Sequence, residues 1–395
     1  MSRIGTIARG IRTGVIKEGD NLTEIVVNSV LEASKEGNFE LQDKDIVAIT
    51  EAVVGISQGN YVTVDDIAND VKNKFNTNHI GIVYPILSRN RFAVLLSAFA
   101  RSMDKITMLL SYPSDEVGND IMDKDKLRES KIPMNNYVIS EDEYEKRFGD
   151  FKHIFTGVNM VDFYRDLAKK ENCEIEFIFS NNPETILKYT KNVLCADIHT
   201  REYTKKIIKE NGGNIVLGLD DIMTTSINGS GYNSEYGLLG SNRSTEEKVK
   251  LFPSNSQELV EKIQNVFKEK TGKTIEVMVY GDGAFKDPVG KIWELADPVV
   301  SPGFTNGLIG SPNEIKLKYI SDNKFADLRG EELNEAIKKE IKEKQADLKG
   351  TIITQGTTPR RYTDLIGSLC DLTSGSGDKG TPVVLIQNYF KNYSD

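Results

Sequence analysis

A glycine-rich stretch near the C-terminus is the part of the sequence best suited to hold a phosphate group. Residues 374–384 read SGSGDKGTPVV and lead into an apolar run that is typical of a strand. Its glycines can adopt backbone angles closed to other residues, so that successive N–H groups can turn toward one anion. The lysine adds a positive charge, and the aspartate a possible metal ligand. The candidate nucleotide-binding residues of this stretch are Gly375, Ser376, Gly377, Asp378, Lys379 and Gly380.

Two better-known phosphate motifs do not describe this stretch. The spacing satisfies G-x-G-x-x-G, but that fingerprint needs a strand before it and a helix after it, and here a strand follows. A P-loop is excluded because the lysine precedes a glycine and no Ser or Thr follows in the required order. A flexible loop before an edge strand remains the alternative interpretation.

A second candidate site is the sequence YGDGAFKDP at residues 280–288. Asp282 follows a predicted strand, and Asp287 lies five residues further on, before a proline. Carboxylates of this kind suit Mg²⁺ or Mn²⁺, which in turn neutralise nucleotide phosphates. Because Asp-Gly is also an ordinary turn dipeptide, a purely structural turn is the alternative.

Two pairs of basic residues are candidates for contacts with an anionic substrate. Arg12 and Lys17 flank an irregular N-terminal turn with many backbone donors, and Arg360 and Arg361 stand beside hydroxyl residues before the last predicted helix. Arginine in such a cluster can bind a phosphate or carboxylate through paired hydrogen bonds. Simple surface placement is the alternative for each of them.

The elements that would position these residues differ along the chain. Apolar spacing predicts helices at 22–33, 62–74, 257–267, 330–349 and 364–372, and strands at 45–50, 79–87, 92–99, 274–280, 351–354 and 382–387. From about residue 140 short helices and strands alternate, with helices at 158–170, 183–191 and 201–210 and strands at 174–179, 193–197 and 214–219. This alternation predicts a small α/β unit with a parallel sheet.

Composition narrows the function classes. The chain of 395 residues has 59 acidic and 50 basic residues, a net charge of −9 that argues against a general nucleic-acid binder. Its three cysteines form no CxxC pair and its three histidines are far apart, so that metal chemistry would have to use carboxylates. We expect a cytoplasmic protein that does not bind membranes, since the sequence shows no long apolar segment and no secretory signal.

The same segments resemble a known family. Residues 11–22, IRTGVIKEGDNL, resemble the opening of the coenzyme F420-0:L-glutamate ligases, the γ-glutamyl ligases of a deazaflavin coenzyme, and 45–59 look like their first strand and turn. Residues 271–283 resemble the strand that delivers metal ligands, and 364–382 the C-terminal helix and nucleotide loop. The resemblance implies an α+β core in three parts: an N-terminal part at 1–139, an inserted α/β unit at 140–245 and a C-terminal part at 246–395.

The resemblance also implies a reaction. Members would use GTP and two divalent cations, Mg²⁺ or Mn²⁺, to activate an acceptor oxygen as an acyl phosphate, which the amine of glutamate then displaces. It implies a homodimer, small-molecule substrates, metal binding by Asp282 and Asp287, and nucleotide binding by Gly14, Val15 and Ile16. This chain departs from the family pattern at Ile56, Ala100, Met103 and Ser376, where the family has Lys, Asp, Asn and Glu. A non-catalytic relative that binds a metabolite or partner is therefore the alternative, and a glycine fingerprint for an oxidoreductase is missing from the central block.

Overall fold

The computed structural model describes residues 3–154, 156–281, 285–286, 293–294, 301–357, 360–374 and 378–395. Contacts divide the chain into two compact units. The first contains Met1–Val54, Asn255–Gly283 and Val299–Asp395, and the second contains Gly55–Ser254 and Ala284–Pro298. The second unit starts well before residue 140, where the change of sequence pattern suggested a boundary, because strands at 79–83 and 105–110 belong to the same sheet as those that follow.

The first unit is built on a five-stranded sheet in the order β1-β16-β2-β12-β15. The strands are β1 (Ile7–Ile11), β2 (Ile46–Thr50), β12 (Glu276–Tyr280), β15 (Gly303–Phe304) and β16 (Val383–Gln387). Pairing is parallel between β2 and β12 and antiparallel elsewhere. Residues of β2, β12 and β16 are buried along nearly their whole length, as expected of strands covered on both faces.

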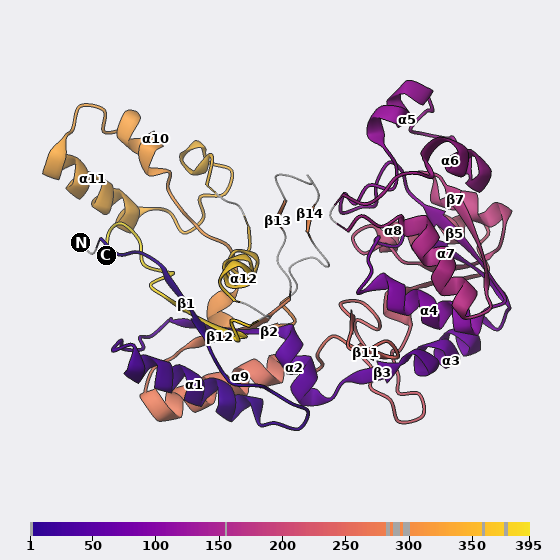
Figure 1. The fold of residues 1–395 in the computed structure, drawn as a ribbon. Coiled ribbons are helices and arrows are strands. Elements are labelled where there is room, and N and C mark those ends of the chain that lie inside the picture. The colour runs from indigo at the N-terminus through magenta and orange to yellow at the C-terminus, as the bar shows by residue number, and fades with distance from the viewer. Residues whose placement is uncertain are drawn as a thin grey trace. The chain divides into compact units, whose positions relative to one another are not determined.

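Helices cover the two faces of this sheet (Figure 1). On one face, α12 (Tyr362–Thr373) packs Ile366 and Cys370 against alternate strand residues such as Ala48 and Met278. The helices α1 (Leu22–Glu36) and α9 (Ser256–Thr271) lie side by side on the other face. A small satellite core joins α10 (Leu317–Asp322) and α11 (Gly330–Glu343), and the short helices η3 (Asn306–Leu308) and η4 (Ile352–Thr354) complete the described elements of this unit.

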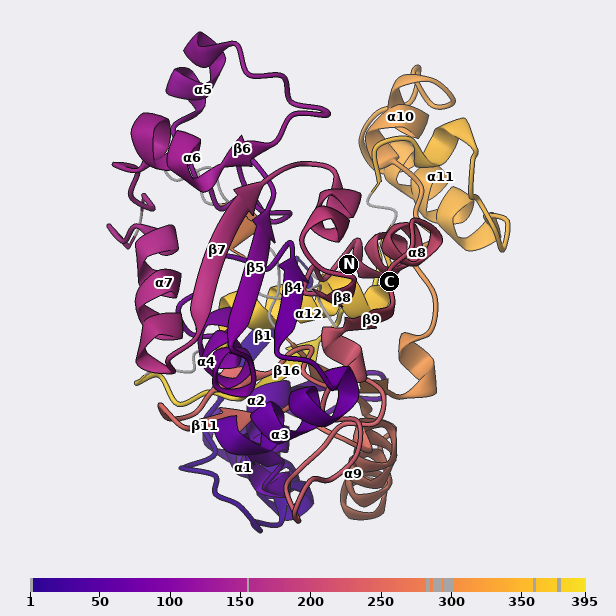
Figure 2. The same cartoon turned by 90° about the vertical axis from the view of Figure 1, so that its right-hand side faces the viewer.

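The second unit contains a six-stranded sheet in the order β6-β7-β5-β4-β8-β9 (Figure 2). Its strands are β4 (His79–Val83), β5 (Lys105–Leu110), β6 (Ile139–Ser140), β7 (Glu174–Phe179), β8 (Asn192–Cys195) and β9 (Ile215–Gly218). All neighbours pair in parallel except β6, which pairs antiparallel with β7 at one edge. An α/β unit with a mostly parallel sheet is thus present, but it includes β4 and β5 and is larger than the unit predicted at 140–245.

Two different hydrophobic cores lie on the two faces of that sheet. Ile82, Met108 and Leu194 face a large core with the helices α3 (Val64–Phe75), α4 (Phe92–Ser102) and α7 (Met160–Lys170). The alternate residues Val83, Leu109 and Cys195 face a smaller core with η1 (Pro183–Lys188) and α8 (Arg201–Glu210). Alternation of side chains along each strand therefore separates the two helical layers.

Shorter elements complete the second unit. These are α2 (Glu51–Gln58), which begins in the first unit, α5 (Lys124–Ser130), α6 (Glu141–Phe148), η2 (Leu219–Asp221), the small sheet of β3 (Tyr61–Thr63), β10 (Asn242–Arg243) and β11 (Lys248–Lys250), and the pair β13 (Phe285–Lys286) and β14 (Trp293–Glu294). Helices and mixed sheets together confirm the predicted α+β fold class. Among the described helices, none has the length and apolarity needed to cross a membrane.

Two predicted strands are wrong. Residues 92–99 form most of helix α4, and 351–354 contain the 3₁₀ turn η4. In α4 nearly every side chain is buried, so the sequence FAVLLSAF has no polar face and its period gives no signal. The predicted helix at 183–191 is a 3₁₀ helix that stops at Lys188. Strands β1 and β5 were not predicted.

Candidate functional site

Four segments of the first unit meet at one edge of the five-stranded sheet. Antiparallel pairing places Ile11, the last residue of β1, opposite Val383, the first residue of β16. Val383 is also opposite Ile49 near the end of β2, and Thr50 is opposite Tyr280 at the end of β12. The loops that leave β1, β2 and β12, and the loop that enters β16, therefore lie at the same edge.

The segment after β1 presents charged and backbone groups to solvent. Ile16 is buried and anchors the segment, whereas Arg12, Val15 and Lys17 are exposed. Gly14 has a φ of +74°, a left-handed conformation that favours glycine, and a Cβ there would meet nothing within 4 Å. The sequence therefore needs glycine here for its backbone angle rather than for space.

The segment before β16 lies against the segment after β1. The Arg12 Nε donates a hydrogen bond of 3.2 Å to the carbonyl oxygen of Lys379, across 367 residues of chain. Asp378, Lys379 and Gly380 are exposed, and Gly380 has a φ of +63°. The structure therefore brings together the two predicted nucleotide-binding segments as far as it describes them. Gly375, Ser376 and Gly377 lie outside the described residues.

The predicted metal ligands, Asp282 and Asp287, also lie outside the described residues. The strand that precedes them is described: β12 ends at Tyr280 and is followed by the buried Gly281 at the same sheet edge. Within the part of the chain that the structure describes, no three His, Cys, Asp or Glu side chains are grouped so that they could hold a metal ion. The metal site therefore stays a prediction, which rests on residues outside the described ranges.

Arg360 and Arg361 do not join this site. Both are exposed, and Arg361 directly precedes α12 without a side-chain hydrogen bond to the helix. The ring of Tyr362 lies 5.3 Å from that of Phe390, just beyond the far end of β16. A helix of 12 residues spans about 18 Å, so the two arginines before its first residue lie at the opposite edge of the sheet from the glycine-rich loop.

The positions that depart from the family pattern lie in different surroundings. Ala100 and Met103 are at the end of α4, with exposed fractions of 1% and 5%, inside the large core of the second unit. Ile56 is on α2, and Ser376 is not described. Ala100 and Met103 therefore serve packing, and a polar ligand at either position would have to be buried among apolar side chains.

A second group of functional candidates, not predicted from the sequence, lies after strands of the second unit. Asp115 follows β5, and burial raises its pKa to about 6 although four N–H groups donate to its carboxylate. Asp197 follows β8 and accepts hydrogen bonds of 2.6 Å from the hydroxyls of Thr200 and Thr204, while burial raises its pKa. The available signal was an acidic residue within five positions after an apolar run, in both cases.

Comparison with known proteins identifies the family. The sequence model of F420-0:Gamma-glutamyl ligase matches residues 10–388, which include the last two residues of β1, the whole of β16 and everything between them. No match to the chain is found among curated proteins. With a match over nearly its whole length, and with both ends of the matched range paired in one sheet, the chain belongs to the F420-0:gamma-glutamyl ligase family.

Proposed function

We propose that this member of a ligase family is a nucleotide- and divalent-metal-dependent amide ligase that adds glutamate to an acceptor, with GTP as co-substrate. One observation supports this proposal above the others: pairing of β1 with β16 puts the segment around Gly14 beside the segment that ends at Gly380. Both are the segments expected to contact the nucleotide, although they lie at opposite ends of the chain.

The chemistry of this edge suits a polyphosphate. Arg12, Lys17 and Lys379 are exposed cations in a protein with a net charge of −9, and Asp378 is the acidic residue among the described residues of the loop. The two left-handed glycines let neighbouring backbone N–H groups turn toward the same anion. Such groups hold a phosphate by position and charge rather than by covalent chemistry.

In the proposed reaction the acceptor carboxylate attacks the γ-phosphorus of GTP, and GDP leaves. The amine of glutamate then attacks the acyl carbon, the amide bond forms, and phosphate leaves while the amine loses a proton. Asp282 and Asp287 would hold the divalent cations, which when bound neutralise the phosphate charges. The residues of the described edge bind and orient the nucleotide, which accounts for most of the catalysis in phosphoryl transfer.

Calorimetric titration of GTP, and then of ATP, with and without Mn²⁺ tests the proposal. We expect metal-dependent binding of GTP, loss of the metal dependence in Asp282→Ala, and about tenfold weaker binding in Lys379→Met, because a charged hydrogen bond contributes roughly 1.5–3 kcal/mol. Lys273→Met is the matched control, since Lys273 is exposed in the turn before β12, at the opposite edge of the same sheet.

The alternative is a non-catalytic relative that binds a metabolite or partner. It is favoured by the absence of a metal-binding group of side chains among the described residues and by the packing role of Ala100 and Met103. If neither nucleotide binds in the presence of Mn²⁺, the ligase proposal fails and this alternative replaces it. Binding of nucleotide that is unchanged in Lys379→Met would refute the location of the site.

A further inference from the structure

A second place suited to a ligand lies where the strand order of the second unit changes direction. Along the chain the parallel strands follow as β4, β5, β7, β8 and β9, but in the sheet β4 has β5 on one side and β8 on the other. The connection after β4 runs through α4 on one face, and the connection after β8 runs through α8 on the other. Loops that diverge in this way leave a crevice at the carboxyl ends of the two strands, where doubly wound folds bind their ligands.

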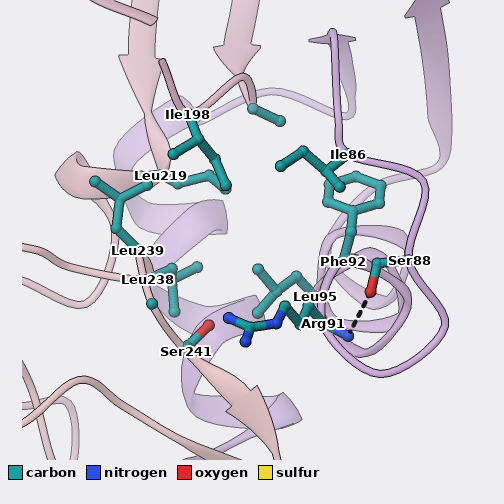
Figure 3. Close-up of a pocket in the computed structure, with 12 residues that line it drawn as sticks. Ile86, Ser88, Arg91, Phe92, Leu95, Ile198, Leu219, Leu238, Leu239 and Ser241 are labelled. Carbon is teal, nitrogen blue, oxygen red and sulfur yellow. Dashed lines mark hydrogen bonds between the residues drawn. The ribbon is translucent and has the colours of Figure 1, made fainter. Parts of the chain in front are cut away.

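A pocket lies at this point, and its size limits what can enter it (Figure 3). Ile86 and Ser88 come from the loop after β4, Ala196 and Ile198 from the loop after β8, and Leu219 directly follows β9. All the lining residues belong to the second unit. The volume of about 40 Å³ is several times the roughly 10–15 Å³ that a single water needs, and far below the about 150 Å³ of a cavity that holds benzene. The pocket can therefore take a short aliphatic molecule but not an aromatic ring.

Most of the pocket wall is apolar. Phe92 and Leu95 come from α4, and Figure 3 shows Ile198 and Leu219 on the side opposite to Phe92. A charged group placed among these side chains would lose its hydration without gaining a partner. Arg91 also lines the pocket, but it has an interaction of its own and is not a free cation. The ligand expected in this pocket is therefore neutral.

One hydroxyl group in the wall is available to a ligand. Ser241 is 5% exposed, and among the described residues no group forms a hydrogen bond with its side chain. Its backbone N–H donates a 3.2 Å hydrogen bond to the carbonyl oxygen of Leu238, which fixes the turn that presents the side chain. Figure 3 shows the Ser241 oxygen turned toward the pocket. By contrast, the hydroxyl of Ser88 already donates to Asn90 and accepts from the N–H of Arg91. A ligand oxygen beside Ser241 would give this buried hydroxyl the partner that it lacks.

A phosphorylated ligand does not fit here. The loop between β4 and α4, residues 84–91, contains no glycine that would let a pyrophosphate approach the backbone. After the end of β8, the backbone N–H groups of Ile198 and His199 donate to the two carboxylate oxygens of Glu116, the second at 3.0 Å. The chain's own carboxylate thus occupies the donors that a phosphate would use, which again favours a neutral ligand.

We propose that the second unit binds a short neutral aliphatic alcohol in this pocket, with its hydrocarbon part among Phe92, Leu95 and Leu219 and its oxygen at the hydroxyl of Ser241. Apolar walls with one placed polar group are the usual form of a small-molecule site. The volume suits a ligand of about three to five non-hydrogen atoms. This site is separate from the glycine-rich edge of the first unit, and it does not depend on whether GTP binds there.

Titration of the full-length protein with 2-propanol and with 2-chloropropane, followed by saturation-transfer NMR, tests the proposal. The two molecules have similar shapes, but only the alcohol forms a strong hydrogen bond. We expect saturable binding of both in the millimolar range, since ligands of this size gain little from each atom. Ser241→Ala should weaken the binding of 2-propanol about fivefold, because one hydrogen bond is lost, and leave that of 2-chloropropane nearly unchanged. Leu239→Trp, at a half-buried lining residue, should fill the pocket and abolish the binding of both.

Ser244→Ala is the matched control, because Ser244 is exposed in the turn between β10 and β11 and does not line the pocket. Circular dichroism checks that each variant is folded. Protection of the peptides 84–95 and 236–243 from hydrogen exchange by 2-propanol, relative to peptides of the first unit, gives a readout that needs no variant. Unchanged binding of 2-propanol in Ser241→Ala, an equal loss for both ligands there, binding that persists in Leu239→Trp, or no binding and no protection at all would each overturn the proposal.

Discussion

Asp115 offers a direct test of how the loops beside the pocket are held. Its Oδ1 accepts from the N–H groups of Val117 and Asn119, at 3.1 and 2.8 Å, and its Oδ2 accepts from the N–H of Leu87 and the side-chain amide of Asn119, at 2.9 and 2.7 Å. Leu87 stands between two lining residues of the pocket. The carboxylate therefore ties the loop after β5 to the loop after β4.

The substitution Asp115→Asn keeps the shape and changes the hydrogen bonding. Whichever way the amide is turned, its NH₂ faces two of the four donors, and two buried N–H groups left unpaired cost about 2–6 kcal/mol together. Removal of the buried charge offsets part of this cost. Burial raises the pKa of Asp115 to about 6 from 3.8, and that difference corresponds to about 3 kcal/mol. We therefore expect a net destabilisation at pH 7 of up to about 3 kcal/mol.

The sign of the pH dependence separates the two effects. A carboxyl whose pKa is raised in the folded state contributes stability that is present below pH 3.8 and is lost as the pH rises through 6. Because pH 4 is already slightly above 3.8, the wild-type unit should lose about 2 kcal/mol relative to Asp115→Asn between pH 4 and pH 7. If the four donors outweighed burial instead, the wild type would gain stability relative to the variant over this range.

Hydrogen exchange of peptides that cover β4 and β5 is the suitable assay, because it reports on this unit alone. The free energy of opening is compared at pH 4 and pH 7 after correction for intrinsic exchange. Asp104→Asn, the same change at an exposed site of the same unit, is the control and should have little effect. If the wild type instead became more stable relative to Asp115→Asn as the pH rises, the reasoning about burial would be refuted.

Two further predictions concern the second unit and the thiols. Arg101 binds Glu171 through two hydrogen bonds of 2.9 Å and also contacts Glu247 and Asp65. Arg101→Met should therefore lower the free energy of opening, measured by hydrogen exchange, by about 1–3 kcal/mol, and by more at low salt than in 1 M NaCl. No change in this free energy would mean that the ion pairs contribute nothing to stability. Cys173, Cys195 and Cys370 are buried, and burial raises the pKa of Cys173 to about 12 and the pKa values of the other two further. None of these thiols should therefore react with a disulfide reagent at pH 8 until urea unfolds the chain. Fast reaction of the native protein would contradict this prediction.

The candidate site could be predicted in its parts but not in its assembly. Gly380 was chosen for its backbone freedom and Gly14 from the family resemblance, and both have positive φ angles. What the sequence did not show is that β1 exists and pairs with β16, since residues 7–11 have a charged residue and a glycine among few apolar ones. Pairing between residues almost 380 positions apart leaves no local pattern. Arg360 and Arg361, close to the loop in sequence, are far from it because a whole helix intervenes.

The second unit shows the opposite limitation. Its alternating helices and strands were recognisable from residue 140 onward, but α4 was mistaken for a strand because a helix buried on all sides has no amphipathic period. That error hid the connection from β4 through α4 to β5. Because this connection was not recognised, the parallel order of the sheet, and hence the pocket at its carboxyl edge, could not be inferred.

The position of the second unit in the chain explains how the first keeps its sheet. Parallel neighbours need a crossover connection, and α9, packed on the sheet before β12, provides the crossover from β2. The main part of the second unit, Gly55–Ser254, is inserted in this connection, between β2 and α9, and Thr50 still lies opposite Tyr280. Its other segment, Ala284–Pro298, lies in the chain between β12 and β15. The edge strand β1 and its neighbour β16 come from opposite ends of the chain, so neither end alone can build the candidate site.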